Sequence, residues 1–145
     1  MIAKVSTVLD CKGYRVVTVS PEASVASVAR VLVTHRIGAA PVVDDNGFLL
    51  GIISERDVVR GISEHGDEAL RYRAEQLMTR EVRTCSLRDQ LNDIMQVMTL
   101  QRIRHLPVVE NGMLQGIVSI GDVVKQRLDE LQLETEELRR YICSS

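Results

Sequence analysis

The chain has 145 residues and a formal charge of −2, from 18 basic and 20 acidic side chains. Apolar residues make up 45% and charged residues 26%, which is typical of a soluble globular protein and excludes disorder of the whole chain. No apolar run is long enough to span a membrane, and no block of like charge suggests a nucleic-acid tail. We therefore expect neither a membrane nor nucleic acid as a partner.

Periodicity and turn residues predict a strand, a helix, a two-stranded hairpin and a second helix in the first part of the chain. β-Branched residues at 16–19 predict the strand, and Ser24 caps a helix with apolar residues at i, i+3, i+4 and i+7. The hairpin has strands at 42–43 and 49–53 around a turn that contains glycine, and Ser54 caps the second helix.

A charged linker at 63–75, with a short helix expected near 68–76, leads to a second copy of this order of elements. The predicted strands and helices of the second copy are strands at 82–85, 106–109 and 114–118, a helix at 87–101 and a helix from Ser119.

The order recurs because the sequence itself is duplicated. Residues 16–59 align with 82–124 at an offset of 66 up to Val43 and of 65 after it, with 18 identities. Only two copies at this long spacing indicate a duplicated small domain rather than a solenoid. Because a unit of about 50 residues buries too little surface to be stable alone, we expect the two copies to pack against each other.

The sharpest local motif is Ser54-x-x-Asp57, repeated as Ser119-x-x-Asp122, each at the start of a predicted helix. One interpretation is a capping box, in which the hydroxyl accepts from a backbone N–H and the acid reaches back. The other is a ligand site, because N–H groups converge at a helix N-terminus and an aspartate there can accept two vicinal ribose hydroxyls. The sequence leaves both interpretations open.

Three motifs, each present twice, carry a resemblance to a known family: Val-x-Thr before a turn, Arg-Ile-x-x-x-Pro-Val-Val, and Gly-Ile-hydrophobic-Ser-x-x-Asp. Over about residues 5–127 the chain resembles a tandem pair of CBS domains (a Bateman module), of the short stand-alone bacterial kind. The resemblance implies an α+β fold of two tandem βαββα units in one pseudo-twofold module, with a C-terminal amphipathic helix. The implied segments are units at 1–64 and 78–127, a linker at 65–77 and a dimerisation helix at 128–145.

The resemblance also implies that clefts between the units bind an adenosyl ligand such as AMP, ADP, ATP, NAD(H) or S-adenosylmethionine. Asp57 and Asp122 match the acid that holds ribose, while Ser54 and Ser119 match the hydroxyl beside ribose or phosphate. The strand-end and adenine-wall positions of the family are matched by Thr18, Thr84, Gly38, Ala39, Pro41, Arg104, His105, Leu106 and Pro107.

The two expected sites differ in their cations. At the first, Arg56 lies beside the helix start, whereas at the second Arg104 and His105 replace small residues of the first copy. Lys12, which aligns with Met78, is a further candidate for contact with a phosphate.

Catalysis is not expected. The candidate sites contain no nucleophile–base pair and no phosphate-cradling glycine loop, and the three cysteines form no C-x-x-C pair or other metal-ligand spacing. We therefore expect a non-enzymatic protein without a metal, and a reduced cytoplasmic compartment.

The C-terminal segment carries apolar residues at alternating steps of four and three. The seam consists of Val124, Leu128, Leu131, Thr135, Leu138 and Ile142. Such a seam either packs along its own domain or pairs with a second chain. Because it extends well beyond the repeat, and because CBS pairs commonly form dimers, a homodimer is the expectation.

Together these features predict a regulatory module that binds an adenine nucleotide, AMP foremost, and senses energy or redox state. Its output would be control of a protein partner through dimer geometry. Two alternatives stay open: a structural dimerisation or scaffold protein with vestigial pockets, and an NAD(H)-binding redox sensor.

Overall fold

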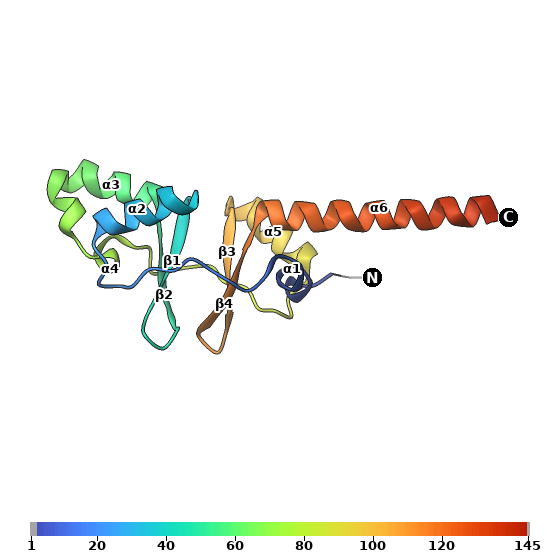
Figure 1. Cartoon of the computed structure of the whole chain (residues 1–145), viewed down its shortest axis with the longest axis horizontal. Coiled ribbons are helices and arrows are strands. Elements are labelled where there is room, and N and C mark those ends of the chain that lie inside the picture. The colour runs from blue at the N-terminus through green and yellow to red at the C-terminus, as the bar shows by residue number, and fades with distance from the viewer. Residues whose placement is uncertain (1–2, 145) are drawn as a thin grey trace.

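The computed structural model describes residues 3–144 and consists of two similar halves, from one of which a long helix projects (Figure 1). Each half contains one antiparallel hairpin. The hairpin strands are β1 (Ala39–Val43) with β2 (Leu49–Ser54), and β3 (His105–Glu110) with β4 (Met113–Ser119). Both hairpins carry an irregularity at the same aligned position. The predicted α+β class, the two repeats and the C-terminal helix are confirmed.

Four helices pack with these hairpins, two in each half. They are α2 (Val25–His35) and α3 (Glu55–His65) in the first half, and α5 (Leu91–Gln101) and α6 (Ile120–Ser144) in the second. Ser24 caps α2 as predicted, accepting from the Ser27 N–H over 3.1 Å. The prediction that α5 begins at residue 87 is wrong. Residues 86–89 form a turn instead, closed by the Asp89 N–H on the Ser86 carbonyl.

The strands predicted at 16–19 and 82–85 are not formed. Each segment contributes one bridge residue, Val19 beside Val42 and Cys85 beside Val108. β-Branched composition predicted a longer pairing. Val16 and Val17, which precede Val19, instead line a cleft between the halves, described below.

The linker holds two short elements where a single helix was predicted. A 3₁₀ helix, η1 (Gly66–Arg71), is followed by α4 (Ala74–Leu77). Tyr72 between them is extended, and its carbonyl accepts from the Val25 N–H over 2.8 Å. The break therefore anchors the start of α2.

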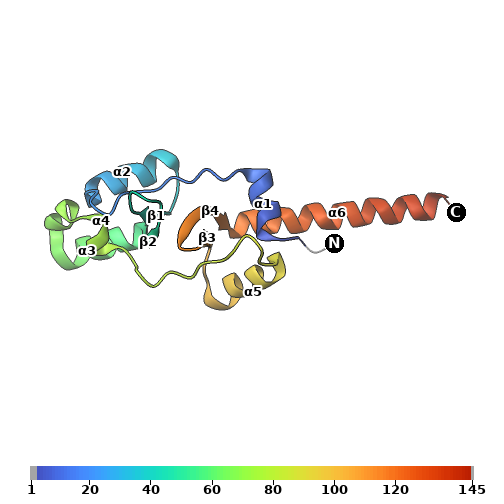
Figure 2. The ribbon, with the colours of Figure 1, turned by 90° about the horizontal axis from the view of Figure 1, so that it is seen from below.

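The first helix, α1 (Val5–Lys12), was not predicted, and it packs on the second half. Its Val5, Val8 and Leu9 are buried in the core that contains β3, β4 and α5. In the same way α4 packs on the first half, where Ala74 lies in the core. Figure 2 shows the two connecting segments passing between the halves. Each half is thus completed by the helix that precedes the other copy in sequence.

Two glycines at aligned positions admit these crossing helices. A Cβ on Gly116 would lie 2.8 Å from a methyl carbon of Leu9, and a Cβ on Gly51 would lie 2.8 Å from the sulfur of Met78. Real Cβ atoms do not approach other atoms so closely, so any larger residue would push α1 or the segment after α4 off its hairpin.

The turn ends of the two hairpins meet. The Leu49 N–H donates to the Gly112 carbonyl over 3.0 Å, and the Leu114 N–H donates to the Gly47 carbonyl over 3.0 Å. Gly47 and Gly112 have φ of 89° and 82°, in the left-handed region that glycine adopts without strain. These bonds fix one end of the boundary between the halves.

Beyond its first turns α6 extends away from the rest of the chain (Figures 1 and 2). Leu128, Leu131 and Leu138 of the predicted seam are each more than half exposed, so the seam does not pack along its own domain. Among the helices described over residues 3–144, none is both long and apolar enough to cross a membrane.

The crossed packing predicts that α1 stabilises the second half. Replacement Leu9→Ala removes a fully buried side chain and should lower the free energy of unfolding by about 2–5 kcal/mol. The matched control is Leu100→Ala on α5, which is 81% exposed and should change stability by less than about 0.5 kcal/mol. Urea unfolding of both variants tests this, and equal effects would contradict the packing.

Candidate functional site

The first junction between a hairpin and a helix, at Ser54 and Asp57, is closed. The Asp57 N–H donates to Ser54 Oγ over 3.1 Å, and Asp57 Oδ2 accepts from the Ser54 N–H and hydroxyl over 2.9 and 3.0 Å. Asp57 Oδ1 accepts from the Thr79 hydroxyl over 3.3 Å, and Arg60 lies 3.7 Å away. Only 6% of this side chain is exposed. Protein donors thus engage both carboxylate oxygens.

The second junction, at Ser119 and Asp122, has the same capping box but a different partner. The Asp122 N–H donates to Ser119 Oγ over 3.1 Å, and Asp122 Oδ2 accepts from the Ser119 N–H over 2.9 Å. Lys12, at the end of α1, donates to Asp122 Oδ2 over 2.6 Å and to the Ile117 carbonyl over 2.9 Å. Among residues 3–144, no hydrogen bond to Asp122 Oδ1 is formed, and 23% of the side chain is exposed.

The charges around Asp122 keep it ionised. Burial alone would raise the pKa of this carboxyl. The hydrogen bonds from Lys12 and Ser119, together with the positive charge of Lys12, outweigh burial and hold the pKa below its usual value of 3.8. Lys12 and Asp122 therefore form a charged, partly exposed pair that joins the first helix of the chain to the last.

A cleft of about 280 Å³ lies between the two halves beside this junction. Five of the residues expected at a site line it, namely Lys12, Ala39, Pro41, His105 and Ser119. Five more were not predicted: Arg15, Val16, Val17, Ile37 and Ile117. Val16, Ile37 and Ile117 are identical in both copies, so the repeat itself was a signal for them, whereas Arg15 had no such signal. Both halves thus contribute both apolar and polar residues to one cleft.

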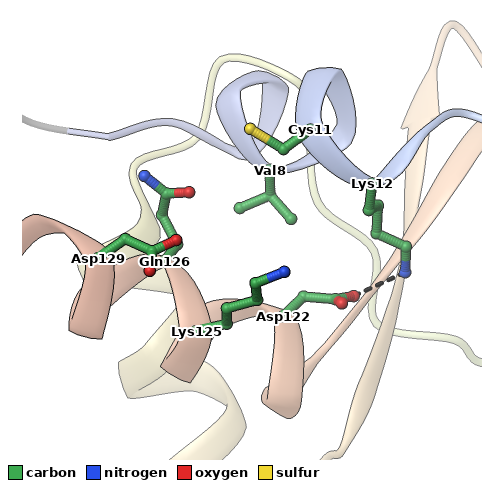
Figure 3. Close-up of a pocket in the computed structure, with 7 residues that line it drawn as sticks. All are labelled: Val8, Cys11, Lys12, Asp122, Lys125, Gln126 and Asp129. Atoms are coloured by element: carbon green, nitrogen blue, oxygen red, sulfur yellow. Dashed lines mark hydrogen bonds and ion pairs between the residues drawn. The ribbon is translucent and has the colours of Figure 1, made fainter.

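A second cavity of about 230 Å³ lies on the other side of Lys12, between α1 and α6 (Figure 3). Val8, Cys11 and Lys12 line it from α1, while Asp122, Lys125, Gln126 and Asp129 line it from α6. In Figure 3 the Lys12 side chain reaches from the end of α1 to Asp122 in the first turn of α6. Lys12 therefore borders both cavities.

His105 stands at the start of β3, opposite Ser119 in the hairpin register. Burial, followed by the positive charge of Lys12, lowers its pKa below 6.5, and Arg104 acts in the same direction, while Asp122 opposes them. The imidazole is therefore neutral at pH 7 and presents a hydrogen-bonding edge without charge to the cleft.

Other expected residues lie outside these two cavities. Thr18, Arg56 and Arg104 are exposed, whereas Leu106 and Pro107 are buried. Gly38 is partly exposed, and its carbonyl accepts from the Glu55 N–H at the start of α3. Thr84 lines a third hollow, of about 180 Å³, along the hairpins. Their expected ligand contacts stay predictions.

Metal-ligating side chains do not gather in the described part of the chain. Over residues 3–144, no group of three or more His, Cys, Asp or Glu side chains is arranged to hold an ion. Cys11 and Cys85 are free thiols, and the side chain of Cys143 lies outside the described part. Burial, with a smaller contribution from Asp89, raises the pKa of Cys85 to about 12, so this thiol stays protonated.

The low pKa of Asp122 predicts an acid-dependent contribution to stability. A carboxyl whose pKa is lower in the folded than in the unfolded protein stabilises the fold above the unfolded value and loses this effect as pH falls. Replacement Asp122→Asn should therefore lower the free energy of unfolding near neutral pH, and the deficit should shrink between about pH 5 and pH 3.

Urea unfolding across this pH range is the measurement. Asp129→Asn, on the same helix but without a contact to Lys12, is the control. A deficit for Asp122→Asn that does not change with pH would contradict the ion pair.

Comparison with known proteins identifies the two halves. A CBS domain matches the chain twice, over residues 11–64 and 74–129. The CBS domain-containing protein YhcV of Bacillus subtilis is 31% identical over 123 residues, which cover 85% of this chain and 86% of YhcV.

Solved structures agree. The CBS-domain containing protein ATU1752 from Agrobacterium tumefaciens has a TM-score of 0.79 and 44% identity, covering 88% of this chain and 95% of its own. CBSX2, solved in complex with AMP, has a TM-score of 0.69 and 29% identity, over 79% of this chain and 89% of its own. This chain, with its two crossed repeats and the cleft between them, belongs to the CBS-domain family.

Proposed function

We propose that this protein is a non-enzymatic regulatory module that binds an adenine nucleotide, AMP foremost, in the cleft beside Ser119 and Asp122. The observation that carries the proposal is the composition of that cleft. Its walls include Val16, Val17 and Pro41, which suit the faces of a base, and Ser119 and Lys12 are among its polar lining residues. Ribose hydroxyls would reach the Asp122 carboxylate. The relative solved with AMP supports this choice of ligand.

The size of the cleft favours a mononucleotide. Small-molecule sites have volumes of roughly 300–1,000 Å³, and the cleft, at about 280 Å³, lies just below this range. A dinucleotide such as NAD(H) would have to extend past Lys12 toward the second cavity. An NAD(H)-linked redox role is therefore the second candidate, and a scaffold with vestigial pockets is the third.

The position of Asp122 would allow ligand binding to change the orientation of α6. Asp122 lies in the first turn of α6, whose far end projects from the body of the protein. A ligand that prefers one arrangement of this turn shifts the population toward that arrangement. The orientation of α6, and of whatever binds it, would then report nucleotide occupancy to a protein partner.

A thermal-shift panel tests the ligand. AMP, ADP, ATP, NAD⁺, NADH and S-adenosylmethionine are compared, with GMP as the control. A ligand at about 100 times its Kd should stabilise the protein by about 2.7 kcal/mol, or about 5–10 °C in Tm for a chain of this size. The largest shift is expected with AMP, and Asp122→Ala should abolish it while the variant stays folded.

A flat panel with folded protein would contradict the sensor and favour the scaffold. A shift with NAD⁺ or NADH alone would favour the redox sensor. A full AMP shift in Asp122→Ala would contradict the assignment of the site.

The seam on α6 is proposed to bind the same seam of a second copy. With Leu128, Leu131 and Leu138 at core positions, Glu134 and Arg139 flank the seam at the positions that face each other between parallel helices. Their opposite charges favour a parallel homodimer. A seam this short would add to a larger interface rather than hold a dimer alone.

Replacement of Leu131 and Leu138 by lysine should therefore weaken the dimer. Burying like charges at a coiled-coil seam should raise the dimer Kd by at least about tenfold, measured by sedimentation. Glu136→Lys, off the seam, is the charge control. A monomeric wild-type protein, or an unchanged Kd in the double variant, would contradict the role of α6.

A further inference from the structure

Lys12 holds the acid on which the proposed ribose site depends. Its ammonium lies 2.6 Å from Asp122 Oδ2 and 2.9 Å from the Ile117 carbonyl, and it lines both the cleft and the cavity of Figure 3. About a third of the side chain is exposed. Lys12 is therefore positioned to contact Asp122 and a ligand in the cleft.

A ligand that engages both oxygens of Asp122 competes with Lys12 for one of them. Of two vicinal ribose hydroxyls, one can donate to Oδ1, which accepts no hydrogen bond from the described residues, while the other has to share Oδ2 with Lys12 and the Ser119 N–H. A lysine separated from its carboxylate loses a charge-assisted hydrogen bond, which is stronger than a neutral one. A phosphate on the same ligand supplies a replacement anion, whereas an unphosphorylated nucleoside supplies none.

The other residues that line the cleft also favour an anionic ligand. Arg15 adds a second cation to its lining, and His105 is neutral at pH 7. Among the described residues that line the cleft, none is acidic. The cleft therefore attracts anionic ligands.

The first junction has no lysine at the position that corresponds to Lys12. At the positions that align with Lys12 and Arg15, the second copy has Met78 and Glu81. The acid of that junction, Asp57, is held by the Thr79 hydroxyl and by Ser54, with Arg60 of its own helix at 3.7 Å. A dependence on phosphate that acts through a lysine is thus specific to the second junction.

From this geometry we infer that Lys12 is a specificity-determining residue that makes the second site select phosphorylated adenosine ligands over adenosine itself. The inference rests on the proposed nucleotide site and adds the chemical class of ligand that the site accepts. Asp122 positions the sugar, and Lys12 exchanges the Asp122 carboxylate for the ligand's phosphate.

Calorimetric titration of the full chain with AMP and with adenosine tests the inference. With Lys12 present, AMP should bind at least about tenfold more tightly than adenosine, since charge-assisted hydrogen bonds contribute at least this factor. Lys12→Met should weaken the binding of AMP by about tenfold. It should leave the binding of adenosine unchanged or make it tighter, because Asp122 is released from the lysine.

Two further variants separate selectivity from structure. Lys12→Arg keeps the charge and should keep the preference for AMP. Lys4→Met, the same substitution at the other end of α1, should keep it as well. Met78 occupies the aligned position in the second copy, so Lys12→Met should fold, and thermal melting checks this. If that variant is unfolded, Lys12→Gln replaces it.

The outcomes are distinguishable. Equal affinities for AMP and adenosine with Lys12 present, or an AMP preference that survives Lys12→Met or Lys12→Gln, would overturn the inference and leave the nucleotide site intact. Failure of the wild-type protein to bind any adenine ligand would overturn the proposed function and this inference with it.

Discussion

The rest of the structure depends on the crossing of α1 and α4, the helices that precede the two repeats in sequence and pack on the opposite halves. α1 is made first along the chain but completes the core of the second repeat, and α4 completes the first. Each fully buried aliphatic side chain on these helices contributes about 1.5–3 kcal/mol through burial. Neither repeat therefore closes its own core from its own sequence copy. The crossing segments and the hydrogen-bonded hairpin turns hold the repeats side by side, with the cleft between them.

The crossing also creates the charged pair at the second junction. Lys12 is the last residue of α1, so the packing of Val5, Val8 and Leu9 brings its ammonium to Asp122, 110 residues away in sequence. The two junctions differ at this position, where the second copy has Met78, and at the next, where it has Thr79 in place of Gly13. The junction with Met78 and Thr79 has a buried, fully engaged aspartate, whereas the junction with Lys12 has an accessible one. Pseudo-symmetry of the backbone thus coexists with a chemical difference between the two junctions.

Local signals predicted the hairpins, the caps at Ser24 and Ser54, and the duplication, because their partners lie within a few residues or recur in the second copy. α1 was missed since its apolar stripe spans only two turns and its partners belong to the other repeat. The strand at 16–19 was overpredicted because β-branched residues serve equally well as the wall of a cleft. Five expected site residues line the cleft. Arg15, which was not expected, also lines it, and it lies in the segment that crosses from α1 to the first half, an arrangement that no local pattern encodes.

The first turn of α6 connects the candidate site to the long projecting part of this helix. Ser119 precedes its first turn, Asp122 lies within that turn, and the helix runs for 25 residues, or about 37 Å. Lys12 is a contact between α1 and this first turn, so exchanging its carboxylate for a phosphate changes how the two helices are held together. At a length of about 37 Å, a tilt of about 5° at the root moves the far end by about 3 Å. A small change in the Lys12–Asp122 ion pair would therefore cause its largest displacement at the exposed seam of α6, where a second chain would bind.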